Sequence, residues 1–165
     1  MGRVMRMIFT LILTFTLLLS CSAEYVGDPF SAFAGETEAE ASLVLSGSGS
    51  SFSYSDNAVL FTAPAEINGY KLQRSGEKAY LSYGELSVPV SDGACRVLRL
   101  CEAVFSPGKA TEIKAVEING ATVTVVKSGE LIYTFSSDGK PVSVSGSFEG
   151  EAFEMTFSDF RVRSK

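Results

Sequence analysis

The stretch that decides the fold is Val142-Ser-Val-Ser-Gly-Ser-Phe-Glu-Gly-Glu-Ala-Phe-Glu-Met-Thr-Phe-Ser158. Apolar and polar residues alternate along both of its halves, and Glu149-Gly150 separates the halves. A period of two is typical of a β-strand with one wet and one dry face. The stretch therefore predicts an antiparallel hairpin, with strands at residues 142–148 and 152–158.

The dry face of this hairpin is expected to bring two sets of side chains together: Val142, Val144 and Phe148 against Phe153, Met155 and Phe157. The next apolar residues, Phe160 and Val162, have the opposite parity. Since a slip of one residue turns side chains to the other face of a sheet, a β-bulge or bend is predicted near Ser158-Asp159.

Short runs of the same kind precede the hairpin along most of the chain. They predict strands at residues 36–45, 51–55, 58–63, 70–74, 79–83, 86–90, 110–118, 121–127 and 130–135. Turn residues separate them, and Asn119-Gly120 is the strongest hairpin signal among these. Residues 94–105 are instead predicted to form one helix, which ends at Ser106-Pro107-Gly108. The predicted fold is mainly β (α+β), an antiparallel meander whose dry face the helix can cover.

The N-terminal segment indicates export. Arg3 and Arg6 precede residues 8–19, which are apolar residues and threonines, and Ser20-Cys21 follows directly. This layout is typical of a secretory signal peptide, and it is shorter than the roughly 20 apolar residues of a membrane-spanning helix. Its ending, Leu-Leu-Ser-Cys, resembles the lipobox of bacterial lipoproteins, in which the cysteine is lipidated and becomes the new N-terminus.

This resemblance implies a signal peptide at 1–20, a lipidated tether at 21–35 and a single domain at 36–165. The implied location is extracytoplasmic, on the cell membrane or, in a bacterium with two membranes, on the outer one. An ordinary signal peptide that happens to have a cysteine near its cleavage site is the alternative. Within the tether segment, Phe30 and Phe33 are candidates for docking onto the domain.

Composition excludes several classes of function. The chain has no histidine and a net charge of −5. Without histidine, Ser-His and Cys-His nucleophile pairs and most zinc sites are ruled out, so we predict no enzyme activity, no metal and no cofactor. An acidic chain without a basic run is also a poor nucleic-acid binder.

Two further features each have a bland and a functional interpretation. Three acidic residues share one face of a predicted strand: Glu36, Glu38 and Glu40. They could form a cation site, but the spacing of a calcium-binding loop is missing. We therefore favour the interpretation that they form a solvated face of the strand. Cys95 and Cys101 are six positions apart, which is about 9 Å of rise in a helix, whereas a disulfide needs Cα atoms within about 7 Å. Two buried free thiols are therefore favoured over a bridge.

The layout as a whole resembles the LolA/LolB-like lipoprotein-carrier superfamily, and more closely small uncharacterised lipoproteins of Gram-positive bacteria. The resemblance lies in the lipobox, Phe61-Thr-Ala-Pro64 before Ile67-Asn-Gly69, one helix, and hairpins that end in Phe157-Ser-Asp-Phe160. It implies an unclosed half-barrel with the helix across its concave mouth, and an apolar concave face that receives acyl chains. This chain departs from the superfamily in having one clear helix and no long N-terminal helix.

Two functions remain open. One is a membrane-anchored module that binds lipid or acyl chains, and the other is a non-enzymatic envelope scaffold with a filled core that contacts another envelope protein. The candidate apolar lining is Leu131, Tyr133, Phe135, Phe148, Phe153, Met155 and Phe157. The same residues could equally form the core of the sheet. An open, dry volume of several hundred Å³ between helix and sheet would favour lipid binding.

Overall fold

The computed structural model describes residues 27–163 of the chain. The predicted signal peptide, Cys21 and the first part of the predicted tether lie outside the described residues. None of the helices in the described part is long and apolar enough to cross a membrane.

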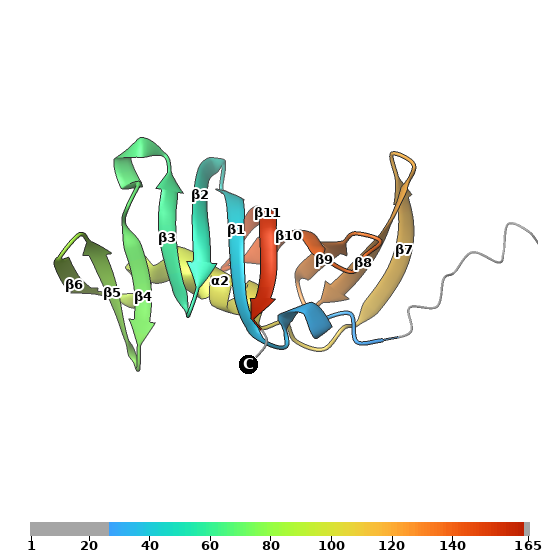
Figure 1. Ribbon diagram of the computed structural model, residues 1–165, viewed down its shortest axis with the longest axis horizontal. Helices are drawn as coiled ribbons and strands as arrows, with labels where there is room; N and C mark the ends of the chain where they lie inside the picture. Colours follow the sequence, from blue (N-terminus) through green and yellow to red (C-terminus); the bar gives the residue numbers. More distant parts are fainter. Residues whose placement is uncertain (1–26, 164–165) are drawn as a thin grey trace, which may run out of the picture.

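One antiparallel sheet of eleven strands makes up most of the described chain (Figure 1). Its strand order is β6-β5-β4-β3-β2-β1-β11-β10-β9-β8-β7. The strands are β1 (Glu36–Leu45), β2 (Ser48–Ser55), β3 (Ala58–Ala63), β4 (Lys71–Ser75), β5 (Lys78–Tyr83), β6 (Leu86–Val90), β7 (Glu112–Ile118), β8 (Ala121–Ser128), β9 (Leu131–Phe135), β10 (Pro141–Phe148) and β11 (Glu151–Arg163). The helical elements are η1 (Ser31–Phe33), η2 (Ala65–Ile67), η3 (Asp92–Cys95) and α2 (Arg96–Phe105).

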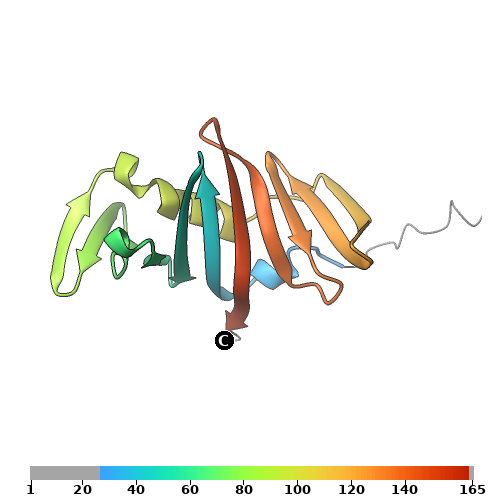
Figure 2. The same cartoon turned by 90° about the horizontal axis from the view of Figure 1, so that it is seen from above.

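The order of the strands confirms the predicted unclosed half-barrel. Strands β1 to β6 form one meander and β7 to β11 a second, and α2 connects the two. The meanders join where β1 pairs with β11, and β6 and β7 are left as the two edges of the sheet. The sheet curves, and α2 lies across one face of it (Figure 2). The predicted helix at 94–105 is confirmed, with its first turn in the 3₁₀ form of η3.

The core lies between the concave face of the sheet and the buried side of the helix. Leu98, Cys101 and Val104 are fully buried on α2, at the spacing of one helical face. They pack against inward residues of the central strands, such as Leu43 of β1 and Met155 of β11. Burial of an apolar side chain stabilises a fold by roughly 1.5–3 kcal/mol, so this layer holds the helix against the sheet.

Both helix cysteines are buried thiols outside any disulfide, as predicted. The Cys95 thiol lies 3.4 Å from the carbonyl oxygen of Ser91. Burial raises the pKa of the Cys101 thiol well above its usual range, which makes this group an unreactive small apolar side chain.

The bulge predicted near Ser158-Asp159 is confirmed. Along the β1–β11 pair, Glu40 is opposite Asp159 and Ala41 is opposite Phe157, so Ser158 is the extra residue. Its hydroxyl donates a hydrogen bond to the carbonyl oxygen of Glu40 at 3.2 Å. The bulge restores Phe160 to the core side of the sheet, where its ring lies 5.6 Å from that of Phe157.

The predicted dry face of the β10–β11 hairpin is wrong at Val142. A second irregularity falls between Pro141 and Ser143, so Pro141 is buried and Val142 is 39% exposed. Proline has no N–H to donate to the ladder and is therefore typical of such an irregularity. Val144 is directly opposite Met155, as expected.

The end of the predicted tether segment packs against the domain. Phe30 and Phe33 are both buried, and their rings lie 5.0 and 5.7 Å from the ring of Tyr133 in edge-to-face geometry. Phe33 also lies 6.2 Å from Phe105 at the end of α2. Residues from Phe30 onward therefore belong to the folded domain, where they fill the concave face over β9 and β11.

Candidate functional site

An open apolar groove lies between the beginning of the helix and strands β3 to β5. Its volume is about 330 Å³. The lining side chains come from the sheet, from η2 and from the first turns of the helix: Phe61, Glu66, Ile67, Tyr70, Leu72, Leu81, Val90, Ala94 and Val97. Glu66 is the one charged residue among them.

Strand register explains why the floor of the groove is apolar. Val59, Leu72 and Leu81 are direct neighbours across β3, β4 and β5, so their side chains point to the same concave face. The η2 segment forms a wall, and two backbone hydrogen bonds tie it to β3. The amide of Gly69 donates to the carbonyl oxygen of Phe61 at 2.9 Å, and the amide of Phe61 donates to that of Tyr70 at 2.9 Å.

The apolar surface continues from the groove to the β6 edge of the sheet. Leu81 is opposite Val88, and Tyr83 is opposite Leu86, so these side chains share the concave face. Tyr83, Leu86 and Val88 are 54%, 76% and 53% exposed. An exposed apolar strip of this kind is a candidate binding surface.

Ion pairs on both flanks of the helix fix its position over the sheet. On the groove side, the Arg74 guanidinium of β4 donates to both carboxylate oxygens of Glu102, with Nε–Oε1 at 2.5 Å and Nη2–Oε2 at 3.1 Å. On the other side, Arg96 Nη1 lies 2.8 Å from Glu151 Oε1, and Arg99 Nη2 lies 2.8 Å from Glu149 Oε1. The helix, which forms one wall of the groove, is therefore held in place by contacts outside the groove.

The seven residues predicted to line a cleft lie elsewhere, on β9, β10 and β11. Tyr133, Phe135, Phe153 and Met155 are buried, and Leu131, Phe148 and Phe157 are partly buried and pack against the same core. None of the seven lines the groove. The rings of Phe30, Phe33 and Phe105 occupy the space above the β9 and β11 residues. A role of the seven in ligand binding stays a prediction.

Sequence reasoning missed the groove residues, although it predicted the strands that present them. The apolar residues of β4 and β5 follow the same alternation as those of β10 and β11. What distinguishes the two sets is how far the helix and the N-terminal aromatic residues reach across the sheet. Nothing in the local sequence gives that information.

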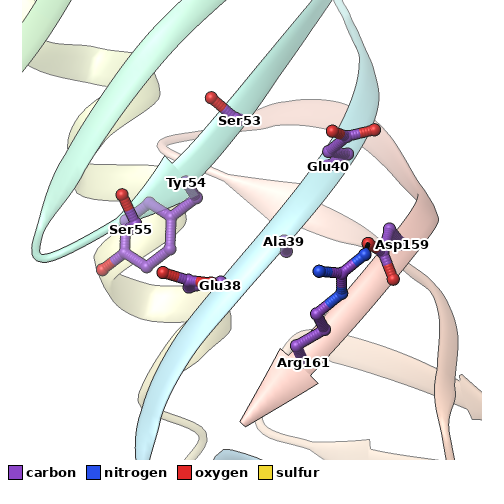
Figure 3. Close-up of a pocket in the computed structure, with 8 residues that line it drawn as sticks. All are labelled: Glu38, Ala39, Glu40, Ser53, Tyr54, Ser55, Asp159 and Arg161. Carbon is purple, nitrogen blue, oxygen red and sulfur yellow. Dashed lines mark ion pairs between the residues drawn. The ribbon is translucent and has the colours of Figure 1, made fainter. Parts of the chain in front are cut away.

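The predicted acidic face of β1 borders a shallow pocket of about 180 Å³ on the convex side of the sheet (Figure 3). Figure 3 shows Arg161 and Asp159 side by side on β11, and Arg161 Nη2 lies 2.7 Å from Asp159 Oδ2. Glu38 forms an ion pair with Arg163. No group of three or more ligating side chains within residues 27–163 could hold a metal ion. The paired charges agree with a solvated face.

Comparison with known proteins gives matches among solved structures alone. No protein-family model matches the chain, and no curated protein matches it by sequence. Among solved structures, it is similar to the lipoprotein LppX from Mycobacterium tuberculosis, with 14% identity, a TM-score of 0.46 and coverage of 84% of this chain and 93% of that one.

Two further matches are LprF from Mycobacterium bovis, with 10% identity, a TM-score of 0.36 and coverage of 84% and 91%, and a LolA superfamily protein from Nitrosomonas europaea. The latter has 10% identity, a TM-score of 0.33 and coverage of 79% and 86%. The predicted closeness to lipoproteins of Gram-positive bacteria stays a prediction. In its architecture the chain is similar to LolA-like lipoprotein carriers, a likeness that concerns the fold and identifies no ligand or partner.

Proposed function

We propose that this chain is a non-enzymatic extracytoplasmic lipoprotein, anchored through Cys21, that binds a single acyl chain or a similarly narrow apolar ligand in the groove beside α2. The observation behind this proposal is the apolar lining of the groove and its continuation to the β6 edge. Ligand sites are typically apolar concavities with few polar groups.

The size of the groove limits what it can bind. At about 330 Å³ it is near the lower end of the roughly 300–1,000 Å³ that ligand pockets have. This volume suits one extended chain better than a lipid with several chains. The groove is also open to solvent, so we expect the exposed residues of β5 and β6 to cover the rest of the bound chain.

The proposed anchor rests on the sequence. Arg3 and Arg6, the apolar residues 8–19 and Cys21 form the layout of a lipoprotein signal peptide. The change Cys21→Ala should release the protein from the membrane fraction or leave its signal peptide uncleaved. Intact-mass measurement of the membrane-bound protein should show a lipid adduct at Cys21, and an unmodified cysteine there would refute the anchor.

The alternative function is an anchored scaffold that binds another envelope protein and no lipid. The observation in its favour is the filled half of the concave face, where aromatic side chains from η1, α2, β9 and β11 contact one another. Under this alternative, the open groove is only the uncovered edge of the core.

The test is binding of a fluorescent fatty-acid probe to the purified protein. Ala94 is exposed and lines the groove, so Ala94→Phe should occupy part of the groove and weaken probe binding with little effect on stability. Ala152→Phe is the matched control, because Ala152 is exposed on β11 and does not line the groove. Absence of probe binding by the unmodified protein, or equal weakening by both variants, would leave the scaffold function.

A further inference from the structure

The outward face of the β7–β8 hairpin differs from the outward face of the central strands. Most outward positions of β1, β2, β10 and β11 are polar: Glu38, Glu40, Ser42, Ser51, Ser53, Ser143, Ser145, Glu154 and Thr156. That is the ordinary pattern of an antiparallel sheet with one solvated side. The β7–β8 hairpin has three valines and an isoleucine among its outward positions, beside Glu112, Lys114 and Lys127.

The pairing of β7 with β8 defines this apolar surface, which we call the hairpin patch: Val116, Ile118, Val123 and Val125. Val116 is directly opposite Val123, and Ile118 is opposite Ala121. Val126 is fully buried on the core side, and since neighbouring residues of a strand point to opposite faces, Val125 and Val123 point outward. Val116 and Ile118 are 39% and 47% exposed.

In the described part of the chain, the β7 half of the hairpin patch is exposed, and Val123 and Val125 on β8 are partly buried. All seven residues of β7 are exposed, and β7 is an edge strand without a neighbour on its outer side. Exposed β-branched apolar side chains on an edge strand are a liability for a soluble protein, unless a partner or a membrane covers them.

The position of the proposed anchor favours the membrane as the cover. Gly27, the first described residue, is six positions after Cys21, and six steps along the chain span at most about 20 Å. Soon after, Phe30 packs against Tyr133 and Phe135 of β9. Strand β7 is two strands from β9, which is roughly 10 Å along the sheet. Both views show the segment from Gly27 to η1 at this end of the sheet (Figures 1 and 2).

The charge of the hairpin also favours the membrane as the cover. Residues 109–128, which contain the hairpin, have three lysines and two glutamates, whereas the whole chain has a net charge of −5. Anionic head groups repel an acidic protein and attract lysines. This hairpin is therefore a part of the domain that can approach an anionic bilayer without electrostatic repulsion.

We propose that the hairpin patch rests on the surface of the membrane to which Cys21 is attached, so that the lipid anchor and the hairpin form one two-point attachment. This orientation rests on the proposed lipidation of Cys21. The β6 edge is eight strands from β9 in the order of the sheet, so the exposed apolar strip beside the groove lies at the end of the sheet far from the proposed contact with the bilayer.

The test uses the full, lipidated protein, purified from membranes and reconstituted in vesicles of phosphatidylcholine and phosphatidylglycerol. An environment-sensitive fluorophore is attached to the variant Ile118→Cys, and to the control variant Val88→Cys on β6, where the native residue is 53% exposed. Cys95 and Cys101 are fully buried and should not react in the folded protein. The quencher is a phosphatidylcholine with a nitroxide near its head group.

We expect the nitroxide lipid to reduce the fluorescence of the probe at position 118 and to leave the probe at position 88 unchanged. Flotation of the same vesicles reports on the anchor separately. A protein that floats with the vesicles but shows no quenching at 118, or equal quenching at both positions, would overturn the docking and leave the anchor intact. A protein that does not float would overturn both. Cross-linking of two copies through position 118 without quenching would assign the patch to a contact between copies and also overturn the proposal.

Discussion

Tyr133 offers the sharpest test of how the helix is held against the second meander. Its side chain is fully buried on β9, and its hydroxyl donates a hydrogen bond to the carbonyl oxygen of Val104 at 3.1 Å. Val104 is one of the last four residues of α2, whose carbonyl groups have no partner within the helix. Burial raises the pKa of Tyr133 well above its usual range, so the phenol keeps the proton that it donates.

The change Tyr133→Phe removes this hydrogen bond and keeps the ring. A hydrogen bond of this kind contributes about 0.5–1.5 kcal/mol, and a buried acceptor left without a donor costs about 1–3 kcal/mol. We therefore expect the free energy of unfolding to fall by about 1–3 kcal/mol, out of the 5–15 kcal/mol that is typical of a domain.

The measurement is equilibrium unfolding in urea, followed by circular dichroism. With a slope of about 2 kcal/mol per molar urea, the midpoint should fall by roughly 0.5–1.5 M. Tyr83→Phe is the control, because Tyr83 is 54% exposed and its hydroxyl lies outside the core, so its loss should cost less than about 0.5 kcal/mol. A midpoint for Tyr133→Phe that matches the control would refute the hydrogen bond to Val104.

Three further predictions follow from the core and its ion pairs. Alkylation of the folded protein should leave Cys95 and Cys101 unmodified, and alkylation after unfolding without reductant should label both; a failure to label them would indicate a disulfide. The hydrogen bond from Arg96 is the main cause that lowers the pKa of Glu151 from its ordinary value of 4.5. The stabilising effect of this hydrogen bond is present above pH 4.5 and is lost as the pH falls through the lowered pKa of Glu151. The change Glu151→Gln should therefore flatten the dependence of stability on pH in that acidic range. Phe157→Ala should cost about 3 kcal/mol in urea unfolding, the lower end of the usual range, because the side chain is only partly buried; a cost below 1 kcal/mol would contradict its place in the core.

Local sequence was sufficient for the elements of this fold. The predicted strands and the helix correspond to observed ones, because alternation and turn signals such as Asn119-Gly120 are local properties. The bulge at Ser158 was also predictable, since the apolar parity changes there by one residue. The irregularity at Val142 does not show in the alternation of Val142 and Val144, and its signal in the sequence is Pro141, which has no N–H to donate to the ladder.

The candidate site could not be located in the same way. Leu72 and Leu81 around the groove follow the same pattern as Met155 and Phe153 in the filled core. Which set is covered depends on long-range packing, in particular on Phe30 and its contact with Tyr133, 5.0 Å away. The sequence indicated that Phe30 could dock, and only the structure shows on which half of the sheet it does.

The dimensions of the fold explain why the groove exists. A helix of ten residues is about 15 Å long, whereas eleven strands at about 4.8 Å spacing span nearly 50 Å along the sheet. Together, α2 and the aromatic residues of the N-terminal segment can cover the middle of such a sheet and leave both ends open. At one end the uncovered concave face forms the groove. At the other end, the hairpin patch lies on the opposite face of the sheet from α2 and near the proposed anchor, where a bilayer can take the place of a second layer of protein.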